Sequence, residues 1–383
     1  MSSLGNMFGS LSSMLSGNGG TNSVLGIDIG SSSIKIVQLR TNKESAILET
    51  YGEIALGPYA GVAVGKATKL PVDKTAEALR DLMKEANVTA VHAGVSIPFA
   101  SSLISMLDLP NVDDVQLKRM IPIEARKYIP IPISEVLLDW FVIPESEKED
   151  DAFDRVVKEG VMQKKGREVL LVAIHNEALR AYQTIMETAG VSVSFFEIEI
   201  FSTIRSALDR SPVPIAVVDM GASTTKIYIV ERGVVHMTHL LNIGAQHITE
   251  SLARAMGWTF EKAERMKREI GLTDSPTYTR EENDRIHQTI ESTFNRMFTE
   301  VNRVLLSFGK RYNKNVSHVV LSGGGSSMPN LSRTAQDGLH AELQIAHPFG
   351  KVESPAFLEE VLRTIGPGFS VAVGVALRKL SEK

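Results

Sequence analysis

The sequence predicts an α/β protein with two similar lobes, and three observations lead to this prediction. Residues 26–39 have the pattern of a strand, a Gly/Ser turn and a second strand, with an acid before the turn and a base after it. Residues 217–230 repeat the pattern Asp-x-Gly-x-Ser-x-x-Lys-Ile. A third Gly-rich turn, at 322–327, again follows an apolar strand. Two lobes that face one ligand are the simplest explanation of a hairpin that occurs twice.

A turn of this composition is suited to holding phosphate. Gly30 lets the backbone approach an anion closely, and the hydroxyls of Ser31 and Ser32 add donors. Lys35 supplies a point charge, and Asp28 can hold a hydrated Mg²⁺ that bridges phosphates. A Gly/Ser hairpin is also ordinary β structure, and it is the repetition that favours a phosphate site.

The second copy offers the same chemistry. The matched pairs are Asp28 with Asp219, Gly30 with Gly221 and Lys35 with Lys226. Ser223 and Thr224 provide the hydroxyls of the second turn, and Gly323 and Gly324 of the third turn suit close packing against a base and sugar. The pattern therefore predicts a nucleotide between the lobes, with any Mg²⁺ held by Asp28 and Asp219 through water.

Length and composition restrict the class of protein. The chain has 383 residues, 43% hydrophobic and 22% charged, which is enough for two domains with full cores. A net charge of −4 without a basic stripe argues against nucleic-acid binding. The absence of cysteine excludes disulfides and Cys-ligated zinc. With no signal pattern and no run of about 18 apolar residues, we expect a cytoplasmic protein that reaches a membrane only through partners or a short surface segment.

Changes in composition along the chain predict its organisation. We expect a flexible tail at 1–22, lobe one at 23–208 with a small α+β insertion at 88–168, lobe two at 209–365, and a helix at 366–383 that returns to lobe one. Apolar residues of the tail recur at helical spacing, so a small docking helix is the alternative there. Its Gly and Ser content favours a mobile tail.

The hydrophobic patterns predict the elements of each part in chain order. Lobe one begins with the hairpin, a strand pair ending near Leu56 and a helix from Asp73 to Met83, and the insertion follows with strands at 91–97, 102–107 and 136–143 and a helix from Asp113. Lobe one resumes with a strand at 168–174, a helix at 176–189, a strand at 191–197 and a helix to Leu208. Lobe two adds a strand at 234–241, helices at 244–256 and 259–270, and a long amphipathic helix near 286–308.

The insertion contains a proline-stiffened apolar segment. Pro130 and Pro132 stop the preceding helix and hold the chain extended. In one interpretation the segment is a rigid crossover under the core of the insertion. In the other, Ile129, Ile131 and Ile133 are presented in a docking groove. The spacing alone does not decide between them.

Three further polar residues are site candidates. Glu199 begins a helix that could cross between the lobes, where its carboxylate would orient a water, although a lone Glu is more often on the surface. Together with Asp28 and Asp219 it completes the candidate catalytic set. Glu264 and Lys267 have the Glu-x-x-Lys spacing of a nucleoside-binding pair, but an ion pair on a solvated helix face would look the same.

Duplicated phosphate hairpins with a late Gly-Gly-Gly turn resemble the actin-like ATPase superfamily, which includes actin, Hsp70, sugar kinases and FtsA. The resemblance implies a two-lobed actin-like ATPase fold with duplicated ribonuclease-H-like lobes. The segment 124–139, EARKYIPIPISEVLLD, together with 26–32 and 199–201, is similar to the type IV pilus assembly protein PilM family. The likeness extends from Val24 to Leu380.

The PilM resemblance implies a cytoplasmic ATP-binding protein of a pilus or type II secretion inner-membrane platform. It also implies a groove that holds the N-terminal peptide of PilN, near Tyr128, Ile129, Ile131 and Ile133. Lys226 stands where several ATP-hydrolysing relatives have an acid, so at most slow ATPase activity is expected. The alternatives are a phosphotransferase or ATPase of the actin-like superfamily and an FtsA-like polymerising membrane adaptor.

Overall fold

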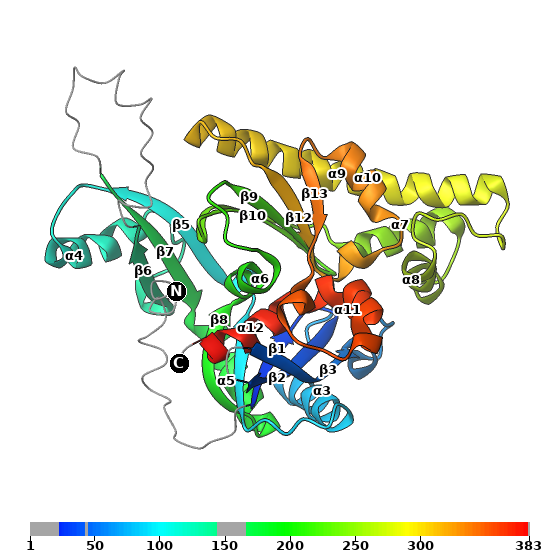
Figure 1. Cartoon of the computed structure of the whole chain (residues 1–383), viewed down its shortest axis with the longest axis horizontal. Coiled ribbons are helices and arrows are strands. Elements are labelled where there is room, and N and C mark those ends of the chain that lie inside the picture. The colour runs from blue at the N-terminus through cyan, green and yellow to red at the C-terminus, as the bar shows by residue number, and fades with distance from the viewer. Residues whose placement is uncertain (1–22, 43–44, 144–165, 382–383) are drawn as a thin grey trace.

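The computed structural model describes residues 23–42, 45–143 and 166–381. The tail expected at 1–22 lies outside these residues. The described chain forms two lobes and a projecting insertion, with one helix, α12, between the lobes (Figure 1).

Lobe one is a five-stranded sheet in the order β3-β2-β1-β4-β8. Its strands are β1 (Ser23–Ile29), β2 (Ser33–Asn42), β3 (Ser45–Ala55), β4 (His92–Ile97) and β8 (Ser192–Ile198). Its helices are α3 (Val72–Glu85), α5 (Asn176–Ala189) and α6 (Glu199–Ala207). Alternation along β2 separates the two faces, because Ile34 and Ile36 join the core that contains α3, whereas Val37 and Leu39 pack with α12.

Lobe two repeats this sheet. The order β11-β10-β9-β12-β13 places its strands as those of lobe one are placed, with an antiparallel hairpin followed by a parallel neighbour. The strands are β9 (Ile215–Met220), β10 (Thr225–Glu231), β11 (Val234–Leu241), β12 (His318–Ser322) and β13 (Glu342–Ile345). The helices are α7 (Ala245–Met256), α8 (Phe260–Glu269), α9 (Arg280–Tyr312) and α10 (Leu331–Gly338). The predicted duplication of the lobes is therefore present in the fold.

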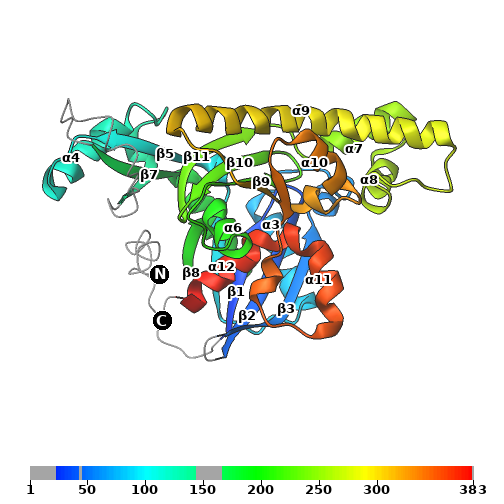
Figure 2. The ribbon, with the colours of Figure 1, turned by 45° about the horizontal axis from the view of Figure 1, so that its top comes forward.

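The long helix α9 buries one stripe and leaves the other side to solvent. Its buried positions include Ile286, Ile290, Phe294, Met297 and Val301, at the spacing of a single helix face. Thr279 and Glu282 form a capping box at its start, which satisfies backbone donors that a helix leaves free. In Figure 2 this helix runs along the top of the molecule, and the insertion lies beyond its C-terminal end.

The insertion is a three-stranded antiparallel sheet, β5-β7-β6, with one helix against it. Its elements are β5 (Ser102–Leu109), α4 (Asp114–Ala125), β6 (Val136–Val142) and β7 (Arg167–His175). Leu117, Ile121 and Ala125 of α4 pack with Leu107 and Leu171 of the sheet. The insertion thus has an apolar core of its own.

Two strands belong to a different sheet from the one that the sequence predicted for them. The strand expected at 91–97 inside the insertion is β4, which pairs with β1 and β8 in lobe one. The strand expected at 168–174 as a return to lobe one is β7, the centre of the insertion sheet. Both are short apolar runs that would suit the interior of either sheet, and pairing partners distant in sequence decide between them.

The C-terminal helix α12 (Ser370–Ser381) packs on β1, β2 and β4 and crosses α6. The short helix α11 (Glu359–Ile365) precedes it. Along the whole described chain, 3-10 turns lie at Gly57–Ala60, Phe99–Ser101, Ile133–Glu135, Gly324–Ser327, Pro348–Lys351, Ala356–Leu358 and Gly366–Phe369. A Cβ on Gly374 would overlap the carbonyl oxygen of Ser202, and a Cβ on Gly26 would overlap that of Ala372. The helix expected at 366–383 therefore does return to lobe one, and its close approach to α6 and β1 requires glycine at both points.

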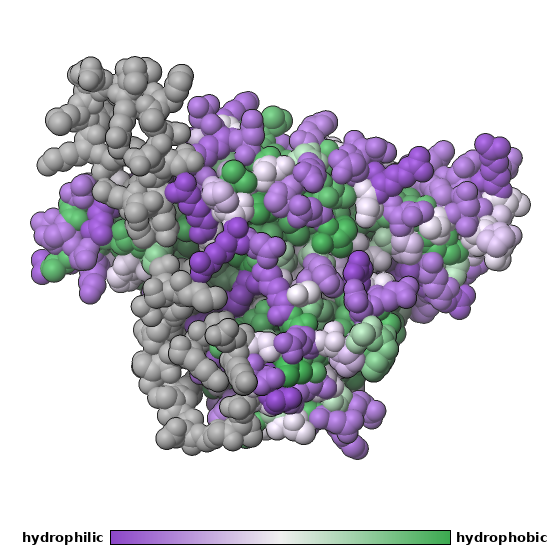
Figure 3. All heavy atoms as spheres, in the orientation of Figure 1, coloured by the Kyte–Doolittle hydropathy of each residue, from purple (hydrophilic) through white to green (hydrophobic). Residues whose placement is uncertain are grey.

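Among the described residues, one helical stretch, Ala356–Leu380, has the length and apolarity of a membrane span. Within it, 61% of the most apolar window is buried inside the protein, as in a core helix. The face drawn in Figure 3 mixes hydrophilic and hydrophobic side chains and shows no continuous apolar band.

A buried charge cluster joins α6, α12 and β8. Arg205 contacts both oxygens of Glu197 at 2.7 Å, Ser202 donates to Glu197 at 2.6 Å, and Arg378 lies 3.2 Å from it. Burial acts to raise the pKa of Glu197, but the two guanidinium groups outweigh burial and hold that pKa below its ordinary value. Arg378 also stacks on the Phe195 ring, 4.3 Å from its centroid.

We expect Glu197→Gln to lower the free energy of unfolding by about 3 kcal/mol at neutral pH, because it removes the charge that faces both arginines. A carboxyl with a depressed pKa contributes stability above its ordinary pKa of 4.5, and that stability is lost as pH falls through the folded value. The deficit of the variant should therefore shrink in acid. Denaturant titration at neutral and acidic pH measures it, and Glu359→Gln, in an exposed pair with Arg363, should change little. Equal stability of Glu197→Gln and the wild type would contradict the assigned role.

Candidate functional site

A cavity of about 720 Å³ lies between the lobes. Every residue that the sequence predicted for the nucleotide site lines it: Asp28, Gly30, Ser31, Ser32, Lys35, Glu199, Asp219, Gly221, Ser223, Thr224, Glu264, Lys267, Gly323 and Gly324. These residues come from both hairpins, the third Gly-rich turn and helices α6 and α8. The fold therefore brings together residues that lie far apart in the sequence.

The two hairpins have the same turn and face each other. In the first, Gly30 N–H donates to the Ser33 carbonyl at 3.0 Å, and in the second Gly221 N–H donates to that of Thr224 at 3.0 Å. Across the cleft, Ser223 Oγ donates to Ser31 Oγ at 3.1 Å. Two Ser-bearing turns that meet in this way direct hydroxyl donors from both lobes to one place, which is the chemistry of a phosphate site.

In lobe one, the acid and the base of the hairpin have separate partners. Asp28 accepts a hydrogen bond from Ser96 Oγ at 2.8 Å. Lys35 forms an ion pair with Glu53 on the neighbouring strand at 3.0 Å. Burial raises the pKa of Asp28, although Lys35 and Ser96 oppose that shift. For Glu53 the balance is reversed, since Lys35 outweighs burial and the pKa is lowered.

In lobe two, the corresponding lysine lies between two acids. Lys226 Nζ is 2.7 Å from Glu199 Oε2 and 3.2 Å from Asp219 Oδ2. The other oxygen of Glu199 accepts the Phe99 N–H at 2.7 Å. Burial raises the pKa of Glu199 more than Lys226 lowers it. Burial acts to lower the pKa of Lys226, but Asp219 and Glu199 outweigh burial and that pKa is raised.

Glu264 and Lys267 form a buried pair instead of lying on a solvated helix face. Lys267 Nζ is 2.6 Å from Glu264 Oε2, and Thr249 donates to the same oxygen at 2.6 Å. Arg268 Nε donates to the other oxygen at 2.6 Å. Gly65 of lobe one has φ +86° and lies so near Glu264 that a Cβ would be 2.5 Å from its carboxyl carbon. This pair is therefore both part of the cavity wall and a contact between the lobes.

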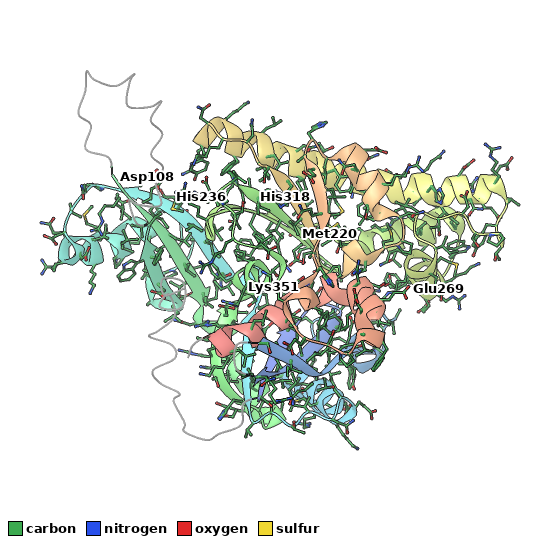
Figure 4. The ribbon with its side chains drawn as sticks, in the orientation of Figure 1. Asp108, Met220, His236, Glu269, His318 and Lys351 are labelled. Carbon is green, nitrogen blue, oxygen red and sulfur yellow. The ribbon has the colours of Figure 1, made fainter. Side chains whose placement is uncertain are left out.

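The third Gly-rich turn approaches Asp219 and the start of α12. Gly323 has φ +82°, and Asp219 Oδ1 and the Met220 carbonyl leave no room there for a Cβ. Its N–H donates to the Pro367 carbonyl at 2.9 Å. At Gly324 an added Cβ would have no atom within 4 Å, so this residue faces open space. Met220, labelled in Figure 4, marks this end of β9 near the middle of the molecule.

Comparison with known proteins identifies the family. The protein-family model described as type IV pilus assembly protein PilM matches residues 26–380. The chain belongs to the PilM family. A solved structure described as a PilM-PilN type IV pilus biogenesis complex has a similar fold, with a TM-score of 0.74 at 23% identity, and the match covers 94% of this chain and 98% of that one. The family and the actin-like fold expected from the sequence are thus confirmed.

This PilM-family chain is also similar in sequence to FtsA proteins and in fold to further solved structures. It is 21% identical to FtsA of Bacillus subtilis (strain 168) over 88% of its own length and 81% of that protein. It is 25% identical to FtsA of Agrobacterium fabrum, of which it spans 51%. EutJ from Carboxydothermus hydrogenoformans has a TM-score of 0.54 at 15% identity, with 98% and 96% of the two chains covered. MreB 5 of Spiroplasma citri, bound to AMPPNP, has 0.50 at 12%, with 95% and 97% covered.

Sequence reasoning missed several polar residues of this PilM-family cavity, among them Ser96, Tyr182, Gln246 and Glu53. Ser96, near the end of β4, could have been found as a polar residue inside a buried strand. Tyr182 of α5 donates to the Ile29 carbonyl at 3.4 Å, and burial raises the pKa of its hydroxyl. Gln246 of α7 accepts the Ala67 N–H at 2.9 Å across the lobes, and Glu53 pairs with Lys35. No local sequence signal marks the last three.

The donor set permits only an indirect metal site. In the part of the chain that the structure describes, no group of three or more His, Asp or Glu side chains is arranged around a common point that could hold a metal ion. Mg²⁺ usually keeps several waters and is held by one or two carboxylates together with phosphate oxygens. Asp28 and Asp219 fit that arrangement as the two protein carboxylates, whereas a site made of protein ligands alone does not fit.

Proposed function

We propose that this chain is an ATP-binding scaffold of a type IV pilus or related type II secretion inner-membrane platform, located on its cytoplasmic side. The main supporting observation is the contact between two equivalent hairpins across one cavity, Ser31 with Ser223 at 3.1 Å. Such a site is complete only when both lobes contribute, so a ligand bound there holds them together. Membership of the PilM family supplies the pilus context.

Each group of cavity residues has a defined role in this proposal. Hairpin N–H groups, the Ser31, Ser32, Ser223 and Thr224 hydroxyls and Lys35 bind the phosphates, while Asp28 and Asp219 hold hydrated Mg²⁺. Glu264 and Lys267 form the wall beside the nucleoside, and Gly323 and Gly324 leave room for its base and sugar. When bound, Mg²⁺ would neutralise phosphate charge.

The site favours nucleotide binding over rapid turnover. Glu199 is our candidate for orienting a water, and both of its oxygens already accept hydrogen bonds, from Phe99 N–H and Lys226. A phosphotransferase requires a free acid beside the acceptor. ATP is therefore proposed mainly as a conformational ligand. Similarity to FtsA keeps a polymerising adaptor as the second candidate.

The proposed partner is the N-terminal peptide of PilN, bound between the insertion and lobe one. Tyr128 is 46% exposed, and Ile131 and Ile133 are partly buried beside the insertion core. Asn176 at the start of α5 donates to the Ser134 carbonyl at 3.0 Å, so this segment touches both parts. The expectation that Ile129 faces the groove is wrong, because Ile129 is 6% exposed and packs in the core of the insertion.

Lys35→Ala should weaken ATP binding about tenfold or more, because it removes a charge-assisted contact with phosphate. Isothermal calorimetry of the purified protein measures the affinity. Lys310→Ala, an exposed lysine on α9, is the control and should bind ATP as the wild type does. If Lys35→Ala and Asp28→Ala both kept the wild-type affinity, the phosphate site would be misassigned.

Steady-state ATP hydrolysis by the wild type should be far below the roughly 1–100 s⁻¹ of a dedicated kinase, because Glu199 is engaged by Lys226. A phosphate-release assay measures it. Kinase-like turnover that disappears in Glu199→Ala would favour the phosphotransferase alternative.

Ile131→Asp should weaken the binding of a labelled PilN N-terminal peptide while ATP affinity and thermal stability stay near wild type. Ile129→Asp should instead unfold the insertion, because it places a charge in an apolar core. Fluorescence titration with ATP present measures peptide binding. Ile123→Asp, at a 63% exposed position on α4, is the matched control. Peptide binding that Ile131→Asp leaves unchanged, or no binding by the folded wild type, would exclude this groove.

A further inference from the structure

The two hairpin lysines occupy equivalent positions but have different surroundings. Lys35 is directed sideways along its sheet, to Glu53 on β3 and to Ser33 Oγ at 2.8 Å. Lys226 is directed to the two acids of the cleft, Asp219 and Glu199. The duplicated sequence pattern therefore supplies one lysine that forms an ion pair with Glu53 and one that forms ion pairs with both Asp219 and Glu199.

Carboxylates are concentrated where a nucleotide would place its phosphates. Asp28, Asp219 and Glu199 all line the cavity, where Asp219 and Glu199 are buried and Asp28 is partly buried. A polyphosphate that approaches three such carboxylates is repelled unless positive charge lies among them. Lys226 Nζ lies within 3.2 Å of two of these carboxylates.

Lys226 is also held in place by several elements at once. It lies directly opposite Asp219 in the β9–β10 register. Glu199 comes from α6, and its second oxygen is fixed by the Phe99 N–H of a 3-10 turn. The ammonium group thus links a sheet of lobe two to a helix and a turn that adjoin lobe one, with only 13% of the side chain exposed.

We propose that Lys226 is a built-in cation that takes over part of the charge neutralisation usually supplied by a divalent ion, so that nucleotide binding depends only weakly on Mg²⁺. This inference rests on the proposed nucleotide site. Among the residues that the structure describes, no group of three acidic or histidine side chains is arranged to hold a metal, which agrees with this role of Lys226. Two of the three acids, Glu199 and Asp219, contact the ammonium group instead.

The first test compares ATP affinity in excess Mg²⁺ and in EDTA. Lys226→Met keeps the length of the side chain but removes its charge. In this variant the dissociation constant in EDTA divided by that in Mg²⁺ should be at least about tenfold higher than in the wild type. Lys35→Met, the equivalent lysine of the other hairpin, should weaken binding under both conditions and change the ratio by less than about threefold. An equal ratio in wild type and Lys226→Met, or an equal rise in both lysine variants, would overturn the proposal.

The second test uses MgCl₂ alone, without nucleotide. Thermal unfolding of Lys226→Met should shift upward as MgCl₂ is added, because the freed carboxylates can bind the ion, whereas the wild type should not respond beyond a NaCl control of matched ionic strength. Lys226→Gln, which keeps an N–H donor toward Glu199, gives the same comparison if Lys226→Met does not fold. Equal responses of variant and wild type would overturn the proposal.

The two tests also separate this inference from the proposed function. A wild type that binds no ATP under either condition would refute the nucleotide site and the inference that rests on it, while Mg²⁺ stabilisation of the variant would still show that Lys226 occupies the place of an ion among the cleft acids. ATP binding with equal Mg²⁺ dependence in all three proteins would refute the cation role alone.

Discussion

The arrangement of the cleft depends on how closely α12 can lie against its neighbours. At Gly374 and Gly26 the backbones are so near that a Cβ at either position would overlap a carbonyl oxygen. At its start α12 is also tied to lobe two, because Ser322 Oγ donates to Ser370 Oγ at 2.9 Å and Gly323 N–H donates to the carbonyl of Pro367, just before the helix. One helix thus connects the Gly-rich turn of lobe two to β1 of lobe one, the strand that carries Asp28.

The parts of the fold that could be predicted from sequence are those whose cause is local. A turn like that at Gly30 or Gly221 favours glycine because a nearby carbonyl, at 3.0–3.1 Å, leaves little room for a Cβ, and such a requirement is visible in the sequence. The repeat added the inference of two lobes. In contrast, β4 and β7 were assigned to the wrong sheets, since apolar strands carry no record of their distant partners.

The same distinction holds for the site. Asp28, Lys35 and their counterparts were predictable because the repeated hairpins contain them, whereas Tyr182 reaches the cleft only because α5 packs against α3 and β4. Ile129 shows what the sequence could not predict. Proline spacing predicted an extended apolar segment but not which of its isoleucines turns inward, and that is decided by the pocket formed by Leu117, Ile121 and Val136.

The acids of the cleft differ in how well their charges are compensated, since the pKa values of Glu53 and Glu264 are lowered by neighbouring cations. Burial raises the pKa values of Asp28 and Glu199, which means that their ionised forms are less favourable there than in water. At Glu197, by contrast, two arginines lower the pKa and the charge is well compensated.

The insertion contacts lobe two, where Thr238 Oγ1 donates to the Ile104 carbonyl at 3.4 Å, and lobe one through Asn176 and Ser134. Any coupling between a ligand in the cleft and one on the insertion must act through differences in such contacts, because a ligand shifts a conformational equilibrium only by its differential affinity for the two states.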